Sequence, residues 1–148
     1  MKAALHKLSG VFRKRPADPM PGGQAKYSLW ARFIFQSGHY RKLAPAQPKP
    51  NAFLPGPLLK TSAIWRDALL DREIWEIGAL LGSERQQQPK ARADLGIAAI
   101  SEANLTIEPD PAPHPRHFNL CGWPTEKDEQ KAIAMVLCAN SSLVERKN

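Results

Sequence analysis

The sequence predicts an α+β fold in which a small, mainly antiparallel sheet of four or five strands is packed by two helices. Two segments have apolar residues at helical spacing, and several shorter segments between Pro and Gly residues are rich in β-branched and aromatic side chains. No Gly-rich phosphate loop follows a predicted strand, which argues against a doubly wound nucleotide-binding fold. The 148 residues, 43% of them hydrophobic, suffice for one domain with its own core.

Residues 1–26 predict a flexible basic tail that precedes a single domain of residues 27–148. The segment ends in RPADPMPGGQAK, whose Pro and Gly residues neither continue a helix nor join a central strand. Before it, Leu5, Leu8 and Val11 recur at helical spacing. A short amphipathic helix is therefore an alternative, and it would be marginal in isolation.

Four segments predict strands. The stretch YSLWARFIFQS, residues 27–37, has no helix or strand breaker and is typical of a buried strand, and KTSAIW predicts a returning strand after a Pro-Gly-Pro corner. Short strands near 92–95 and at 105–108 flank a helical turn that reaches about residue 103. The stretch 38–51 contains three prolines and predicts a long polar loop.

Two segments predict helices. Residues 71–82, DREIWEIGALLG, place Ile and Leu at i, i+3 and i+4 spacings, begin with acids and end at Gly82. Residues 126–145 predict a long helix that packs one side on the sheet. Thr125 is the expected cap of this helix, with Asp128 in the place of the acid of a capping box.

The net charge of +7 is distributed unevenly along the chain. Residues 1–60 contain eleven Lys or Arg and one acid, Asp18, whereas the rest of the chain is slightly acidic. A basic front half attracts nucleic acid or an acidic protein surface. The predicted nucleic-acid-binding residues are Arg13, Lys14, Arg15, Arg32, Arg41 and Lys42. A solvated tail without a partner is the simpler interpretation of the first six cations.

Cysteine content and hydropathy predict a cytoplasmic protein that does not enter a membrane. The two cysteines, Cys121 and Cys138, are too few for a secreted disulfide scaffold of this length. His6 and Lys7 interrupt the apolar stretch near the N-terminus before it reaches the length of a signal peptide core. No stretch approaches the length of a membrane span.

The segment PDPAPHPRHFNLCGWP, residues 109–124, concentrates the most chemistry. If the protein is an enzyme, the predicted catalytic residues are His114, Arg116, His117 and Asn119. A histidine would act as acid or base on a phosphodiester, Arg116 would bind the phosphate in a bidentate manner, and Asn119 would orient a group. This pattern is typical of small metal-independent ribonucleases.

The residue types of this segment are also compatible with two other chemistries. His114, His117 and Cys121 are residue types that zinc accepts, but Pro115 prevents a regular helix and the spacing differs from that of zinc fingers and zinc proteases. Cys121 paired with a histidine would be an activated nucleophile, yet its apolar neighbours favour a small buried side chain. We therefore predict no metal and no cofactor.

The same segment also fits a stiff structural connector. Each X-Pro bond favours extended backbone, so the prolines would lead into a strand HFNLCGW with Phe118, Leu120 and Gly122 on one face.

Aromatic residues elsewhere in the chain also have two interpretations. Core packing is favoured for Trp65 and Trp75, and a stacking surface for single-stranded nucleic acid is the alternative, most open for Trp30 and Tyr40.

The order of AFLP, a tryptophan strand, EIWEIG, ADL and IEPDPAPHPRHFNLCGWPTEKDEQK resembles a family of small bacterial proteins from genomic islands, over about residues 27–145. The resemblance implies a bacterial origin and a single domain, and no function or catalytic residue comes with it.

The charge distribution and the segment 109–124 lead to two expected functions. The first is a non-enzymatic accessory or adaptor protein that binds nucleic acid or a protein partner through the basic half. The alternative is a small phosphodiester hydrolase with its site at residues 114–121.

Overall fold

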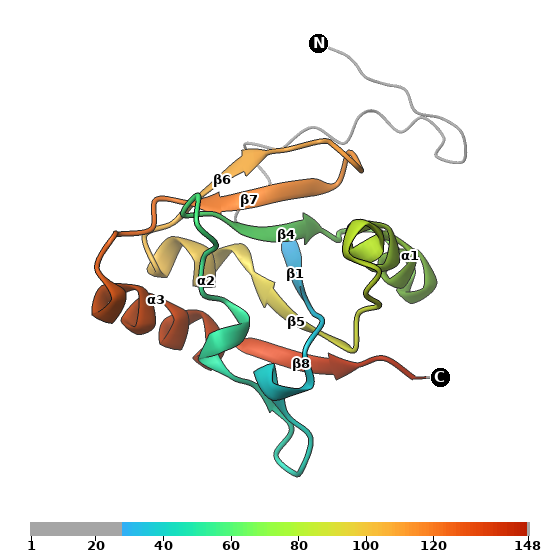
Figure 1. Ribbon diagram of the computed structural model, residues 1–148, viewed down its shortest axis with the longest axis horizontal. Coiled ribbons are helices and arrows are strands. Elements are labelled where there is room, and N and C mark those ends of the chain that lie inside the picture. The colour runs from blue at the N-terminus through green and yellow to red at the C-terminus, as the bar shows by residue number, and fades with distance from the viewer. Residues whose placement is uncertain (1–27, 148) are drawn as a thin grey trace.

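The computed structural model describes residues 28–147, which form an α+β fold with an antiparallel sheet (Figure 1). The described residues give this sheet six strands, in the order β6-β7-β4-β1-β5-β8, where four or five were predicted. Its strands are β1 Leu29–Ile34, β4 Thr61–Trp65, β5 Ala91–Gly96, β6 Thr106–Pro109, β7 His117–Cys121 and β8 Ser141–Glu145. The helices are α1 Asp71–Gly82, α2 Ile97–Glu102 and α3 Lys127–Ala139.

The sheet has an apolar layer on each face. Ala31 and Phe33 of β1 and Ile64 of β4 pack against Ile74 and Ile77 of α1. The larger layer lies on the other face, between the sheet and α2 and α3; its members include Trp30, Trp65, Phe118, Leu120, Ile100 and Leu137. Alternate residues of a strand point to opposite faces, so one set of strands supplies both layers.

Two glycines let α1 approach the end of β1 closely. A Cβ atom at Gly78 would lie 2.6 Å from the Phe33 ring, and one at Gly82 would lie 2.6 Å from the Phe35 ring and 2.3 Å from the carbonyl oxygen of Gln87. No real side chain fits at such distances. The predicted helix 71–82 is confirmed with these bounds, and its last glycine serves a close approach as well as the helix end.

The predicted helix 126–145 is wrong at its C-terminal end. Helix α3 ends at Ala139, and residues 141–145 form β8, which pairs antiparallel with β5 and makes one edge of the sheet. Leu143 and Val144 fit a helical pattern in the sequence, but the backbone of β5 offers hydrogen bonds that only a strand can take. The N-terminal cap also differs, because Glu126 occupies the cap position without a side-chain hydrogen bond.

The segment 38–51 is more ordered than the predicted polar loop. It contains the short 3₁₀ helices η2 Ser37–His39 and η3 Pro50–Ala52, and the two-stranded ribbon of β2 Tyr40–Arg41 and β3 Gln47–Pro48. The side chain of Tyr40 is 5% exposed and Trp30 is fully buried. These two rings are core residues and offer no stacking surface.

Residues 110–116 form the loop of the β6-β7 hairpin. Pro109 pairs with Phe118 and Thr106 with Cys121, so the chain reverses within the proline-rich segment. The backbone N–H of His117 donates to the carbonyl oxygen of His114 at 2.9 Å, which closes the turn into β7. The strand predicted after this segment is confirmed, with Phe118 and Leu120 in the core.

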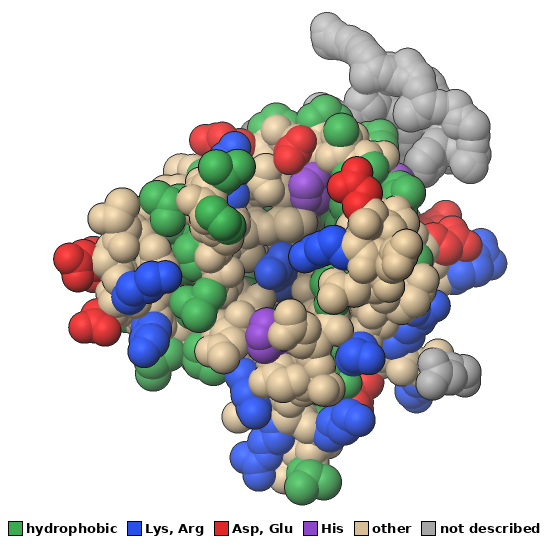
Figure 2. All heavy atoms as spheres, viewed as in Figure 1, with side chains coloured by type: hydrophobic (Ala, Val, Ile, Leu, Met, Phe, Trp, Pro, Cys, Tyr) green, Lys and Arg blue, Asp and Glu red, His purple; other side chains and the backbone are tan. Residues whose placement is uncertain are grey.

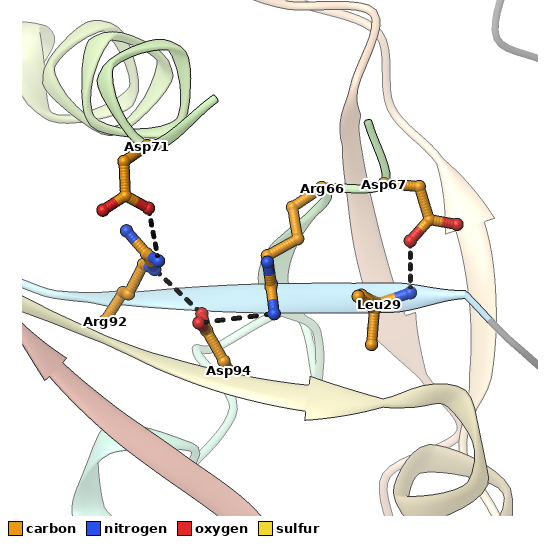
Figure 3. A network of polar contacts seen from close by, with 6 residues as sticks. All are labelled: Leu29, Arg66, Asp67, Asp71, Arg92 and Asp94. Carbon is orange, nitrogen blue, oxygen red and sulfur yellow. Dashed lines mark hydrogen bonds and ion pairs between the residues drawn. The ribbon is translucent and has the colours of Figure 1, made fainter. Parts of the chain in front are cut away.

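A charge network around the buried Arg92 joins α1 to the sheet (Figure 3). Arg92 of β5, 3% exposed, donates from Nε to Asp94 at 2.9 Å and from Nη2 to Asp71 of α1 at 3.0 Å. Asp94 also pairs with Arg66 at 3.5 Å. The Arg92 guanidinium lies 5.0 Å from the centre of the Trp75 ring. The network ties the start of α1 to the sheet through charge as well as apolar packing.

None of the helices of residues 28–147 is long and apolar enough to cross a membrane.

Candidate functional site

A serine and a histidine meet on adjacent strands. Ser62 Oγ of β4 and His117 Nε2 of β7 are 2.7 Å apart, although the residues are 55 positions apart in the chain. The strand register explains the meeting, because Ser62 pairs with Asn119 and Ile64 with His117. Paired residues point to the same face, and Ile64 lies under α1. The serine and the histidine therefore share the face that α1 covers.

The tautomer of His117 follows from its second partner. Nδ1 lies 2.8 Å from the backbone carbonyl oxygen of Asp110, which can only accept a hydrogen bond. Nδ1 therefore carries the proton and donates to that oxygen. The lone pair of Nε2 is left to accept the hydrogen bond from the Ser62 hydroxyl. This is the arrangement of a base that takes a proton from a serine.

The Asp110 carboxylate lies beside the same ring. Its Oδ2 atom is 3.7 Å from His117 Nδ1 and accepts a hydrogen bond from Asn119 Nδ2 at 3.0 Å. The Asp110 N–H donates to the backbone carbonyl of His117 at 3.0 Å. A carboxylate at this distance stabilises the positive imidazolium that forms when His117 accepts a proton. Asn119 orients that carboxylate.

Ser62 and His117 open into a pocket of about 220 Å³. The pocket lies between the end of α1 and the loop of the β6-β7 hairpin. Its walls are Arg32, Phe33, Phe35, Ser62, Leu81, Arg85, Pro113 and His117. The close approaches at Gly78 and Gly82 place the two phenylalanine rings in these walls.

Two arginines supply the charge of the pocket. Arg32 donates from Nε to the carbonyl oxygen of Ala52 at 2.8 Å and from Nη1 to that of Ser62 at 3.1 Å. Burial, with a smaller contribution from the nearby Arg85, lowers the pKa of Arg32 to about 10. Arg85 of η4, residues Ser83–Arg85, lies 5.4 Å over the Phe35 ring. Arg32 therefore remains cationic at neutral pH.

No described residue supplies a counterion for these cations inside the pocket. None of its lining residues is Asp or Glu, and neither arginine makes an ion pair within residues 28–147. Nη2 of Arg32 makes no hydrogen bond to the described residues. Two neighbouring cations repel each other, and a bound anion removes that repulsion. The pocket is therefore suited to a phosphate or a similar anion.

Arg116, the arginine predicted to bind phosphate, lies in the core. It is 2% exposed, and its Nη1 atom donates to the carbonyl oxygens of Trp65 at 2.9 Å and Asp67 at 2.7 Å. Its guanidinium lies 4.6 Å from the centre of the Trp65 ring. Arg116 thus holds the hairpin to the end of β4. His114 accepts a hydrogen bond from the Arg116 backbone N–H at 3.0 Å and is not among the residues that line the pocket.

The predicted basic residues divide between two places. Arg32 lies in the pocket, whereas Arg41 and Lys42 are exposed on the β2-β3 ribbon, where Figure 2 shows Lys and Arg side chains gathered. Lys42 also lines a polar groove of about 510 Å³ near the end of β8, together with Tyr40, Gln88, Pro89, Lys90, Glu145 and Arg146. Arg13, Lys14 and Arg15 lie outside the described residues.

Cys121, Cys138 and His39 are not among the residues that line the pocket. Burial raises the pKa of both Cys121 and Cys138, which keeps these free cysteines in the thiol form at neutral pH. Burial, Arg32 and Lys49 lower the pKa of His39. Within residues 28–147, no three His, Cys, Asp or Glu side chains form a group that could hold a metal ion.

The sequence did not single out Ser62, Arg85 or Asp110. Ser62 has one visible signal, since it is a polar residue on the same strand face as the buried Ile64. Arg85 lies in a polar stretch after a helix and Asp110 among prolines, where such residues are common. Comparison with protein families, with curated proteins and with solved structures finds no match for this chain.

Proposed function

We propose that this protein is a small hydrolase of phosphodiesters, with His117 as its acid and base. The observation that carries the proposal is the pocket in which His117 Nε2 faces Ser62 Oγ at 2.7 Å beside Arg32 and Arg85, which make no ion pair with the described residues. The sequence favours binding through the basic half and offers this hydrolase as the alternative. Its phosphate contacts move from Arg116 to Arg32 and Arg85.

Each group has a distinct role in such a reaction. Arg32 and Arg85 would bind the non-bridging oxygens of the phosphate and stabilise the charge that develops on them. His117 would take a proton from the attacking oxygen through Nε2 and return it to the leaving oxygen. The Asp110 backbone carbonyl would hold the ring in the required tautomer, and Asn119 would orient the Asp110 carboxylate beside it.

The volume of the pocket limits what enters it. At about 220 Å³ it is smaller than the roughly 300–1,000 Å³ of pockets that enclose a drug-sized ligand. A phosphate and the groups bonded to it therefore enter, while the remainder of a larger substrate stays outside.

Because both cysteines are free and their chemistry suits a reducing compartment, we propose a cytoplasmic location for this activity.

Hydrolysis of bis(p-nitrophenyl) phosphate tests the proposal, because release of nitrophenolate needs no knowledge of the natural substrate. The protein should hydrolyse this diester, and His117→Ala should lower the rate by about 10²–10⁴-fold. His114→Ala is the matched control, since that histidine is in the same hairpin and does not line the pocket. Equal rates for the parent and His117→Ala, or no rate above that of buffer, would reject the proposal.

A second candidate function, nucleic-acid binding through the basic half, is favoured by the groove beside the β2-β3 ribbon. Lys42, Lys90 and Arg146 line this groove against a single acid, Glu145. Such a cluster binds a phosphate backbone through release of counterions. The double variant Lys42→Ala/Lys90→Ala should weaken binding of a fluorescent single strand. The double variant Lys127→Ala/Lys131→Ala on α3 removes the same charge elsewhere and should not.

A further inference from the structure

We propose that Ser62 is the nucleophile of the pocket and carries the phosphoryl group as a covalent intermediate. This inference rests on the proposed hydrolase function and deepens it. In the proposed function alone, water or a hydroxyl of the substrate could attack the phosphorus while His117 removes its proton. The structure instead places a protein hydroxyl at the base.

Three contacts prepare Ser62 for attack. Its hydroxyl donates to Nε2 of a histidine whose tautomer is set by the Asp110 carbonyl, so the base that receives its proton is already in place. Its own carbonyl oxygen accepts a hydrogen bond from Arg32 Nη1 at 3.1 Å. The same guanidinium thus holds the nucleophile by the backbone and belongs to an arginine that lines the pocket that the anion would occupy.

Arg32 also compensates for a short strand pairing. The described register of β1 with β4 contains two pairs, Trp30 with Trp65 and Ala31 with Ile64. Beyond them, the Arg32 side chain bonds the backbone carbonyl of Ser62. The serine therefore lies beyond the last pair of β1 with β4, where the pocket begins, while on its other side it stays paired with Asn119 of β7.

The chemical steps balance without a co-reactant other than water. Ser62 Oγ forms a bond to phosphorus, the bond from phosphorus to the leaving oxygen breaks, and the serine proton passes through His117 Nε2 to that oxygen. Water then attacks the phosphoserine diester. His117 Nε2 takes one proton from the water and returns it to Ser62 Oγ as the bond between Oγ and phosphorus breaks. The products are an alcohol and a phosphate monoester.

This mechanism defines the class of substrate. A ribonuclease of the kind expected from the sequence uses the 2′-hydroxyl of RNA as its nucleophile. When the protein supplies the nucleophile, a 2′-hydroxyl is unnecessary. The protein should therefore hydrolyse diesters that lack one, such as DNA oligonucleotides and bis(p-nitrophenyl) phosphate.

A fluorophosphonate probe tests the nucleophile directly, because attack on its phosphorus expels fluoride and leaves a stable adduct. Intact mass spectrometry of the full chain should show one adduct, and peptide mapping should place it on Ser62. Ser62→Ala should abolish labelling and lower diester hydrolysis by about 10³-fold or more. His117→Ala should slow labelling as well. Ser101→Ala, an exposed serine of α2, should label and hydrolyse like the parent.

The outcomes separate this inference from the function on which it rests. If His117→Ala loses hydrolysis while Ser62→Ala keeps it and no adduct forms, Ser62 is not the nucleophile and the hydrolase proposal stands. If the parent neither hydrolyses the diester nor takes the probe, both proposals fail. Circular dichroism of Ser62→Ala distinguishes a lost nucleophile from a lost fold, and Ser62→Cys, which keeps a nucleophile at that position, should retain covalent labelling.

Discussion

The Ser62 hydroxyl donates to His117 Nε2 at 2.7 Å across two neighbouring strands of the sheet. The Asp110 carbonyl fixes the opposite side of the ring, so the histidine is held between two partners and faces a pocket that contains two arginines. The bond serves stability as well as any chemistry. The two contributions are separable by experiment.

His117→Ala should lower the free energy of unfolding by about 1–3 kcal/mol, because it removes two hydrogen bonds at a residue that is 8% exposed. His114→Ala removes the hydrogen bond that the Arg116 backbone N–H donates, at a partly exposed residue, and should cost less, about 0.5–1 kcal/mol. Urea unfolding of the two variants measures the difference. A larger loss for His114→Ala would contradict the assigned hydrogen bonds.

Arg85→Ala should weaken binding of inorganic phosphate by about 10-fold, because the bound phosphate would lose one charge-assisted hydrogen bond from the Arg85 guanidinium. Arg85 is exposed, so this change should leave the melting temperature within a few degrees of the parent. Titration followed by NMR measures the affinity. Arg41→Ala removes an exposed arginine outside the pocket and should bind phosphate like the parent; a matching loss there would show that phosphate binds by net charge alone.

Asp94→Asn should destabilise the protein by about 3 kcal/mol, since it removes a carboxylate shared by the buried Arg92 and by Arg66 (Figure 3). Glu76→Gln is the matched control. It breaks the 3.9 Å pair with Arg72, in which both side chains are about 70% exposed, and should cost less than about 0.5 kcal/mol. Thermal unfolding measures the loss of stability in each variant. Equal losses in the two variants would contradict the prediction.

The stability of the protein should fall as the pH drops through the range in which His39 titrates. Burial, Arg32 and Lys49 lower the pKa of His39 in the folded protein below its ordinary 6.5. The unfolded chain therefore binds more protons there, and folding loses stability from about pH 6.5 downward. His39→Gln should reduce this loss. Urea unfolding at pH 7.5 and pH 5.0 makes the comparison, and identical pH dependence of the two proteins would refute it.

Binding of a single-stranded oligonucleotide should weaken steeply as salt concentration rises, because residues 1–60 contain eleven cations and one acid. Deletion of residues 1–26, which removes Arg13, Lys14 and Arg15, should flatten the slope of log affinity against log salt. Fluorescence anisotropy measures both proteins. An unchanged slope would remove these three residues from the interface, and salt-independent binding would reject the electrostatic proposal.

The sequence determined the elements whose identity is local. The helix at 71–82 and the strands at KTSAIW and HFNLCGW follow from side-chain period, breakers and β-branched residues, and the structure confirms them. The strand at residues 141–145 could not be predicted from the local sequence. Their apolar residues fit a helix as well as a strand, and only the unpaired backbone of β5 beside them decides for β8.

The tertiary structure alone decided the composition of the candidate site. His117 was visible in the sequence because it stands in an unusual segment. Ser62 and Arg85 are ordinary residues that become important only when β4 pairs with β7 and α1 ends over β1. The physical reason is that the register of a sheet brings together residues that are far apart in the sequence. A pairing offset by one residue would turn Ser62 to the opposite face from His117, and no pattern within either strand records which register the two will take.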